Sequence, residues 1–273
     1  MQNFSASPKE MVASLWRNRQ LIRNLIHREV VGRYKGSMLG IFWSLATPIF
    51  MLAVYTFVFS VVFKARWGAG GSDSKTEFAL VLFAGLMVFN LFSECVGSAP
   101  GLVLANVNYV KKVIFPLEVL PWVRMGSALF HFLISLGVWL LAYLVFFGIP
   151  QWQFLLLPLV LLPLVLFVMG LSWALASLGV YLRDVSQIIG LAITVLMFLT
   201  PIFYPASSLP TAYQPLIFLN PLTPPIEMVR DLLYWGKLPN LSLLAIYALG
   251  SLTCAVLGFA WFQKTRKGFA DVL

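Results

Sequence analysis

The sequence predicts an all-α membrane protein that crosses a bilayer six times, and two observations lead to that prediction. Hydrophobic residues make up 60% of the 273 residues and charged residues only 11%, with a mean hydropathy of +0.88, whereas a typical soluble domain carries about 25% charged residues. The charges also fall into islands separated by long uncharged runs. Because about 20 mostly apolar residues span a bilayer as a helix, these runs are long enough for several spans.

The first helix is expected to lie on the membrane surface. Ser7 fits a helix N-cap, Pro8 the first helical position and Glu10 the third, so a helix is predicted over 8–31. Apolar side chains form one stripe of this helix and basic side chains another, which is typical of an amphipathic interface helix. The alternative is a docking helix for a protein partner, and the two roles are compatible. Residues 1–35 form the predicted N-terminal segment.

Six spans follow from the positions of the uncharged runs. The run 36–63 has no charge, and Glu94 is the only charge from Phe78 to Val110. The run from Met125 to Leu182 is too long for one helix, and the glycine and proline of residues 148–151 divide it into a hairpin. The predicted spans are 36–63, 78–99, 122–147, 154–182, 186–204 and 239–263, which together make up a domain over 36–263 that is followed by a tail over 264–273.

Prolines interrupt the chain between the fifth and sixth spans. Seven prolines lie from residue 201 to residue 225, and a backbone broken by proline is tolerated at membrane depth only where it is buried in protein or lines a cavity. We therefore expect re-entrant outer helices here, whose second arm begins at Thr223 and stops at Gly236. Glu227, Arg230 and Asp231 are expected to face the outer headgroups.

The distribution of basic residues predicts the orientation. With both termini inside, the inner segments hold 14 of the 19 lysines and arginines, as the positive-inside rule requires of a cytoplasmic side. Both termini and the pair Lys111 and Lys112 are therefore expected in the cytoplasm. The net charge of +9 indicates topology and contact with anionic membrane lipids, and no nucleic-acid partner is expected.

Aromatic side chains and one carboxylate are the candidate path residues within the spans. Rings at membrane depth usually serve packing or interfacial anchoring, but they can also stack on the C–H faces of sugars. The candidates for such a path are Trp43, Tyr55, Phe59, Phe198 and Tyr204. A carboxylate inside a span is costly and often functional, so Glu94 is a candidate intramembrane charge, with a snorkelling or helix-pairing role as the alternative.

No site for catalysis or metal binding is expected in this chain. Cys95 and Cys254 have neither disulfide nor metal-ligand spacing, and His27 and His131 are isolated in the sequence. The charge-rich first 35 residues lack the apolar core of a cleavable signal peptide. A phosphate-binding loop is missing too, and Glu94 with His131 makes a weak ion relay for a secondary transporter. An energy source outside the chain is therefore expected.

The segment NYVKKVIFPLEVLP, residues 108–121, predicts a short two-faced helix between the second and third spans. Val103, Val107, Val110 and Ile114 recur at helical spacing, Asn108, Lys112 and Phe115 fall on the opposite face, and Pro116 ends the helix. One face of this helix is therefore available to a partner at the inner surface.

Six stretches in order resemble the permease subunits of ABC exporters for lipid-linked polysaccharide, the family that handles O-antigen, teichoic acid and capsule. They are RYKGSMLGIFWSLATP (33–48), NYVKKVIFPLEVLP (108–121), YLRDVSQII (181–189), LTPIFYP (199–205), LNPLTPPIEMVRDLL (219–233) and KGFADVL (267–273). With the span pattern, the resemblance covers essentially the whole chain. The stretches FPLEVLP and FADVL are most similar to the O-antigen and teichoic-acid branch.

The resemblance implies a homodimer that works with two copies of a separate cytoplasmic ATPase. ATP and magnesium would be bound by that ATPase, so no cofactor is expected in this chain, and the substrate would be an undecaprenyl-linked polysaccharide, O-antigen above all, exported across the bacterial inner membrane. By the same resemblance, residues 103–115 form a coupling helix and the first and fifth spans line the glycan path. The implied coupling positions are Asn108, Lys111, Lys112, Phe115 and Pro116.

Two other functions compete with this one. A permease of the same architecture could move teichoic acid, capsule, a drug or a small lipid. A membrane-embedded acyl or glycosyl transferase is the alternative from another class, with Glu94 and His131 as its few catalytic candidates.

Overall fold

The computed structural model describes residues 5–62, 67, 75–111, 115–210 and 212–273. All regular structure in these residues is helical. The helices are α1 (Pro8–Arg17), α2 (Arg19–Tyr34), α3 (Trp43–Tyr55), α4 (Lys75–Ser98), α5 (Val107–Lys111), α6 (Leu120–Phe147), α7 (Leu157–Tyr181), α8 (Val185–Leu199), α9 (Gln214–Leu219), α10 (Thr223–Arg230), α11 (Leu241–Thr265) and α12 (Phe269–Val272). π-Helical turns extend α3 over Thr56–Val62 and α10 over Asp231–Trp235.

Five helical segments of the described chain are long and apolar enough to cross a membrane. They are Gly40–Phe59, Thr76–Gly101, Leu117–Phe147, Trp152–Tyr181 and Leu241–Val272. The fifth predicted span, 186–204, is shorter than expected: α8 has 15 residues, or about 22 Å of helix against a hydrocarbon core of about 30 Å. It ends at Leu199 because Pro201 cannot continue the helical hydrogen bonding. The chain is a multi-pass membrane protein.

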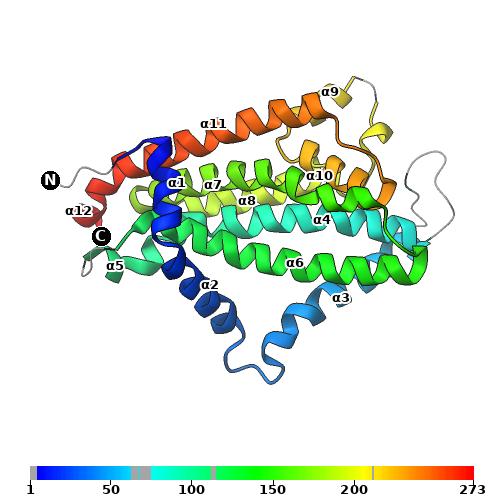
Figure 1. Cartoon of the computed structure of the whole chain (residues 1–273), viewed down its shortest axis with the longest axis horizontal. Coiled ribbons are helices and arrows are strands. Elements are labelled where there is room, and N and C mark those ends of the chain that lie inside the picture. The colour runs from blue at the N-terminus through cyan, green and yellow to red at the C-terminus, as the bar shows by residue number, and fades with distance from the viewer. Residues whose placement is uncertain (1–4, 63–66, 68–74, 112–114, 211) are drawn as a thin grey trace.

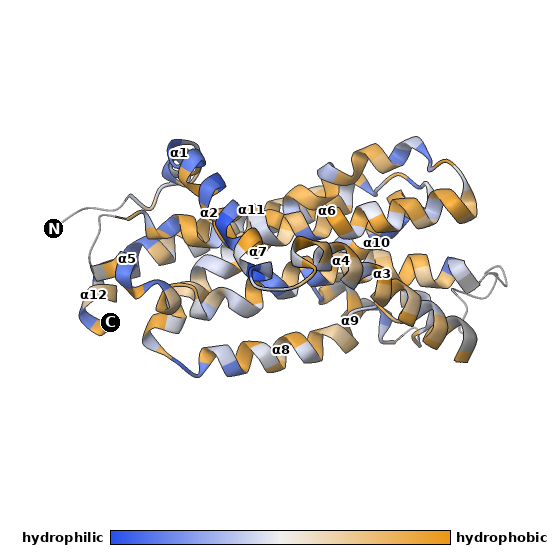
Figure 2. Ribbon diagram, turned by 90° about the horizontal axis from the view of Figure 1, so that it is seen from below, coloured by the Kyte–Doolittle hydropathy of each residue, from blue (hydrophilic) through white to orange (hydrophobic). Residues whose placement is uncertain are grey.

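Helix α4 forms the centre of the bundle. In the apolar 18-residue stretch of α4, 83% of the residues are buried. The corresponding share is 11% for the segment that contains α3 and at most 39% for the other three segments of spanning length. The remaining helices surround α4 and turn apolar faces outward, so hydrophobic residues cover most of the bundle, while hydrophilic residues gather on α1 and α2 (Figure 2). Lipid tails can solvate such outer faces because they are as apolar as the side chains.

Helices α7 and α11 touch backbone to backbone. A Cβ atom on Gly170 would collide with the main chain of Cys254 and Ala255, and one on Gly258 would collide with the main chain of Gly170. Small residues allow the two helices to approach closely. In lipid, where the hydrophobic effect does not drive helices together, this close packing holds them to one another. The pair is therefore a rigid unit at one side of α4.

Both termini and α5 lie at the same end of the bundle, whereas α9 and α10 lie toward the other (Figure 1). The hairpin between α6 and α7 falls where the sequence predicted, because Gly148 ends α6 with φ +84°. At the start of α11, Asn240 caps the helix by accepting hydrogen bonds from the N–H groups of Ser242 and Leu243 at 3.1 and 3.2 Å.

The single amphipathic helix predicted over 8–31 is two helices. The start is confirmed, because the Ser7 hydroxyl accepts the N–H of Glu10 at 3.2 Å, but the chain bends at Asn18, whose side chain donates to the Ser14 carbonyl at 2.9 Å. A competing side-chain hydrogen bond of this kind favours a helix end. As a result the apolar stripe divides: Ile22 and Leu25 are buried, and Trp16 is 70% exposed.

The proline-rich chain between α8 and α11 forms the short helices α9 and α10, and Arg230 at the end of α10 does not face headgroups as predicted. Its side chain is 1% exposed. The guanidinium donates to the carbonyls of Val81 (3.0 Å), Pro201 (2.6 Å) and Ile202 (2.8 Å), pairs with Glu227 at 2.9 Å, and lies 4.4 Å from the ring of Trp67. The breaks at Pro201 and Ile202 leave carbonyls free, and Arg230 satisfies them while joining α10 to α4.

Candidate functional site

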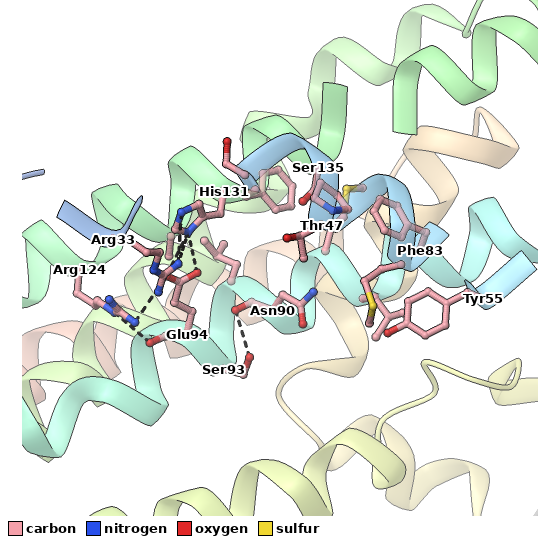
Figure 3. A pocket seen from close by; sticks show the side chains of 18 of the residues that line it. Arg33, Thr47, Tyr55, Phe83, Asn90, Ser93, Glu94, Arg124, His131 and Ser135 are labelled. Atoms are coloured by element: carbon pink, nitrogen blue, oxygen red, sulfur yellow. Dashed lines mark hydrogen bonds and ion pairs between the residues drawn. The ribbon is translucent and has the colours of Figure 1, made fainter. Parts of the chain in front are cut away.

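A cavity of about 620 Å³ between α3 and the bundle is the candidate functional site. Its walls come from the end of α2 and from α3, α4 and α6, and charged side chains gather at one end of it while Tyr55 and Phe83 lie at the other (Figure 3). The polar side chains along it are Ser44, Thr47, Asn90, Ser93 and Ser135. The cavity thus combines a charged end, hydroxyl and amide groups, and an aromatic end.

Glu94 is the centre of the charged end. Its carboxylate lies 2.9 Å from Arg33 Nη2, 3.1 Å from His131 Nδ1 and 3.6 Å from Arg124 Nη2. Arg124 also pairs with Glu29 of α2 at 2.7 Å. We call these five residues the charged cluster; they join α2, α4 and α6 at one point.

Helix geometry explains why these side chains meet. Arg33 is in the last turn of α2, where a cation is favoured by the helix dipole. Arg124 and His131 are seven residues apart on α6, which is two helical turns and therefore one face. That face lies against the last turns of α4, where Glu94 stands.

The ring of His131 lies between the charged partners. Its Nδ1 lies 3.1 Å from both Glu94 and Arg33 Nη1, and its Nε2 lies 3.3 Å from both the Tyr34 hydroxyl and Arg33 Nη1. Two guanidinium groups face two carboxylates in the cluster, so the charges are neutralised within the protein. Glu94, Arg124 and His131 are only 17–19% exposed, where unpaired charges would be costly.

Several cavity hydroxyls already donate to their own helices. Ser44 donates to the Ile41 carbonyl at 2.7 Å and Thr47 to the Trp43 carbonyl at 2.9 Å. Their oxygens remain acceptors that can face a ligand. Across the described residues, no group of three or more His, Cys, Asp or Glu side chains is placed to hold a metal ion.

Four of the five aromatic candidates gather at and beyond the aromatic end of the cavity. Tyr55 lines the cavity, and its ring centre lies 6.5 Å from that of Phe59, which stacks on Phe203 at 5.6 Å. Phe203 in turn lies 6.1 Å from Phe198, whose carbonyl accepts the Tyr204 hydroxyl at 3.2 Å. Trp43 stands apart at the start of α3 and is 42% exposed.

The coupling positions are only partly described. Helix α5 begins at Val107, four residues after the start of the predicted helix over 103–115, and residues 112–114 lie outside the described residues. Asn108 on α5 is exposed. Lys112 lies outside the described residues, as does the side chain of Lys111. The ring of Phe115 stacks on the ring of Tyr109, with the ring centres 4.3 Å apart, so one face of Phe115 is already covered within this chain. Pro116 is half-buried and precedes the turn Leu117–Val119.

The sequence named Glu94 and His131 together, as a weak relay and as catalytic candidates of a transferase. It did not predict that Arg33 and Arg124 pair with Glu94. The signal was nevertheless present, because both arginines border predicted spans and Glu94 lies near the inner end of one. Charged side chains that lie at the same membrane depth on different spans pair with one another, because an unpaired charge there is costly.

Comparison with known proteins places the chain in a family. Residues 20–234 match the model of the ABC-2 type transporter. The O-antigen export system permease protein RfbA of Myxococcus xanthus is 28% identical, over 96% of this chain and 98% of the relative, and the protein of the same name from Klebsiella pneumoniae is 27% identical, over 91% and 93%. The polysialic acid transport protein KpsM of Escherichia coli is 22% identical, over 90% and 93%. The chain therefore belongs to the ABC-2 type transporter family and is a permease of that family.

Proposed function

We propose that the chain is the transmembrane permease of an ATP-driven exporter that moves an undecaprenyl-linked polysaccharide, O-antigen in particular, across the bacterial inner membrane. The observation that carries the proposal is similarity over more than nine-tenths of both chains to proteins named O-antigen export system permeases. The cavity supports it, because hydroxyl and amide groups can bind sugar hydroxyls while rings stack on the C–H faces. Tyr55, Phe59, Phe198, Tyr204 and Trp43 are the proposed path residues.

In the proposed topology, the end that holds both termini and α5 faces the cytoplasm. Helix α8 makes the fifth of six crossings, and the depth that its 15 residues leave uncovered is filled from outside by α9 and α10. The excess of lysine and arginine in the inner segments supports this orientation. The exposed Trp16, with Arg19 4.9 Å from its ring, suits the headgroup layer of that leaflet.

In the proposed assembly, two copies of the chain work with two copies of a cytoplasmic ATPase. Helix α3 is the least buried of the long helices, and Trp43 on it and Phe198 on α8 are exposed. A second copy against these faces would enclose a path between the subunits. The ATPase would contact α5 and its flanks, with Asn108, Lys111, Lys112, Phe115 and Pro116 as the coupling positions.

Deletion of the gene in its host tests the function. We expect finished lipid-linked polymer to accumulate inside the cell and the surface polysaccharide to disappear, as measured by fractionation and immunoblotting of the glycan. The wild-type gene and a variant on the outer apolar face, Leu141→Ala, should both restore export, because Leu141 is 63% exposed. Normal surface polysaccharide in the deletion strain would contradict the proposal.

Two alternatives have specific support. Capsule export is favoured by the similarity to the polysialic acid transport protein, and the same deletion separates it from O-antigen export by which polymer is lost. A membrane transferase is favoured by the 3.1 Å contact of Glu94 with His131. Transfer of an acyl or glycosyl group by the purified chain, abolished in the variant Glu94→Gln with His131→Ala, would establish it.

A further inference from the structure

One guanidinium group holds the chain that follows α5. Arg266 lies just beyond the last residue of α11, and its Nη1 pairs with Glu118 at 2.5 Å while Nη2 donates to the carbonyl of Phe115 at 2.6 Å. The two charged side chains are 10% and 7% exposed. Arg266 thus binds both a side chain and the main chain of the four-residue segment 115–118, which lies between α5 and α6 in the sequence.

Glu118 brings two more helices to the same place. Its other carboxylate oxygen accepts the hydroxyl of Ser14 in α1 at 3.1 Å. Its main-chain carbonyl accepts the indole N–H of Trp173 in α7 at 3.0 Å. Four parts of the chain that are distant in sequence therefore meet at this one buried residue.

Arg266 is itself held firmly. The Tyr181 hydroxyl donates to the carbonyl of Thr265 at 2.8 Å, and the hydroxyls of Ser177 and Thr265 lie 2.6 Å apart. Phe269, the first residue of α12, is fully buried and packs on the rings of Tyr181 and Phe262. The end of α11 is therefore fixed to α7, the helix with which it already shares backbone contact.

The contacts on the α5 side of the segment are of a different kind. Phe115 stacks on Tyr109 of α5 with ring planes 11° apart, and the Tyr109 hydroxyl accepts from Arg28 of α2 at 3.2 Å. Arg28 is exposed, so this contact is weaker than the buried pair. Buried, charge-assisted and forked hydrogen bonds are strong and directional. The segment is thus rigidly fixed on the bundle side and more loosely on the α5 side.

We propose that Glu118 and Arg266 are positioning residues for energy coupling, because they hold segment 115–118, the joint on which Tyr109 of α5 packs, firmly on the helices α1, α7 and α11. A displacement of α5 reaches those helices only if the segment does not yield. The inference rests on the proposed function in that the displacement is supplied by an ATPase at α5. It goes further by assigning a role to the C-terminal end of the chain.

Transport stoichiometry tests the joint. The full-length chain, assembled with its ATPase in proteoliposomes, is compared with Arg266→Gln, Arg266→Lys and Glu118→Gln for glycan exported per ATP hydrolysed. We expect Arg266→Gln and Glu118→Gln to lower this ratio at least about fivefold while ATP hydrolysis persists. Arg266→Lys should lie in between, because an ammonium group keeps the charge but cannot bind Glu118 and the Phe115 carbonyl as a fork.

A variant that is destabilised elsewhere is the matched control. In Trp139→Phe, the chain loses the indole hydrogen bond to the Leu80 carbonyl, which is buried between α6 and α4. It should lower the thermal midpoint in detergent without changing export per ATP. An unchanged ratio in Arg266→Gln, or an equal fall of the ratio in Trp139→Phe, would overturn the inference.

Amide hydrogen exchange keeps the inference separate from the proposed function. In the wild-type complex, a non-hydrolysable ATP analogue should change amide exchange in residues 107–111 and also in α1. The change in α1 should be lost in Arg266→Gln and reduced in Arg266→Lys. If no glycan is exported but this spread is observed, the proposed substrate is wrong and the joint stands. If the analogue alters residues 107–111 of the wild type and leaves α1 unchanged, the joint is refuted.

Discussion

At the scale of single residues, Glu94 shows how a membrane protein keeps charge at depth. The carboxylate is tolerated because Arg33, Arg124 and His131 surround it, and each partner would be costly alone. We expect Glu94→Gln to lower the stability of the protein by about 2 kcal/mol, because two guanidinium groups lose a shared counter-ion. The measurement is the thermal midpoint in detergent.

A double-mutant cycle separates this pairing from general damage. Arg33→Gln combined with Glu94→Gln should be more stable than the sum of the single losses predicts, because the second change removes an unpaired charge. The exposed pair of Arg17 and Glu10, 2.5 Å apart, is the control and should show coupling of at most about 1 kcal/mol. Strict additivity at Glu94 and Arg33 would show that the ion pair contributes nothing.

At the scale of helices, the sequence was most informative where glycine and proline stop a regular pattern. The hairpin after Phe147, the cap at Ser7 and the stop at Gly236 were all predicted, because each depends on a few neighbouring residues. The bend at Asn18 and the early end of α8 were not. Asn18 is one of several polar residues in this part of the sequence, and nothing marks it as the position of the bend. The apolar run before Pro201 does not indicate at which residue the helix ends.

The contact of α7 with α11 gives the prediction for this scale. Gly258→Ala should lower the thermal midpoint, since the added methyl group would collide with the main chain of Gly170 and separate the helices. Gly250→Ala in the same helix is the control. A Cβ there meets nothing within 4 Å, so this change should be neutral or stabilising by up to about 1 kcal/mol. Equal midpoints for the two variants would contradict the close packing of α7 on α11.

At the scale of the whole molecule, the sequence predicted a polytopic helical membrane protein and its family but not the candidate site. Composition and the length of an uncharged run depend on many residues, so a wrong interpretation of one residue does not change the predicted fold class. The cavity depends on how α2, α3, α4 and α6 lean on one another, which periodicity does not determine. Arg230 is the clearest case: it was expected at the headgroups because it is charged, and it is buried because broken backbone carbonyls need a donor.

The proposed coupling end of the molecule provides the last prediction. The variant with Asn108→Ala and Lys111→Ala should insert and keep the wild-type thermal midpoint, because Asn108 is exposed on α5, yet bind the ATPase at least about tenfold more weakly, which corresponds to about 1.4 kcal/mol. Phe115→Ala is a poorer test, since it also removes the stack on Tyr109. The control replaces Ser207 and Ser208, exposed at the opposite end, and should leave binding unchanged. Co-purification at graded salt measures the affinity, and equal retention by both variants would mean that the ATPase binds elsewhere than α5.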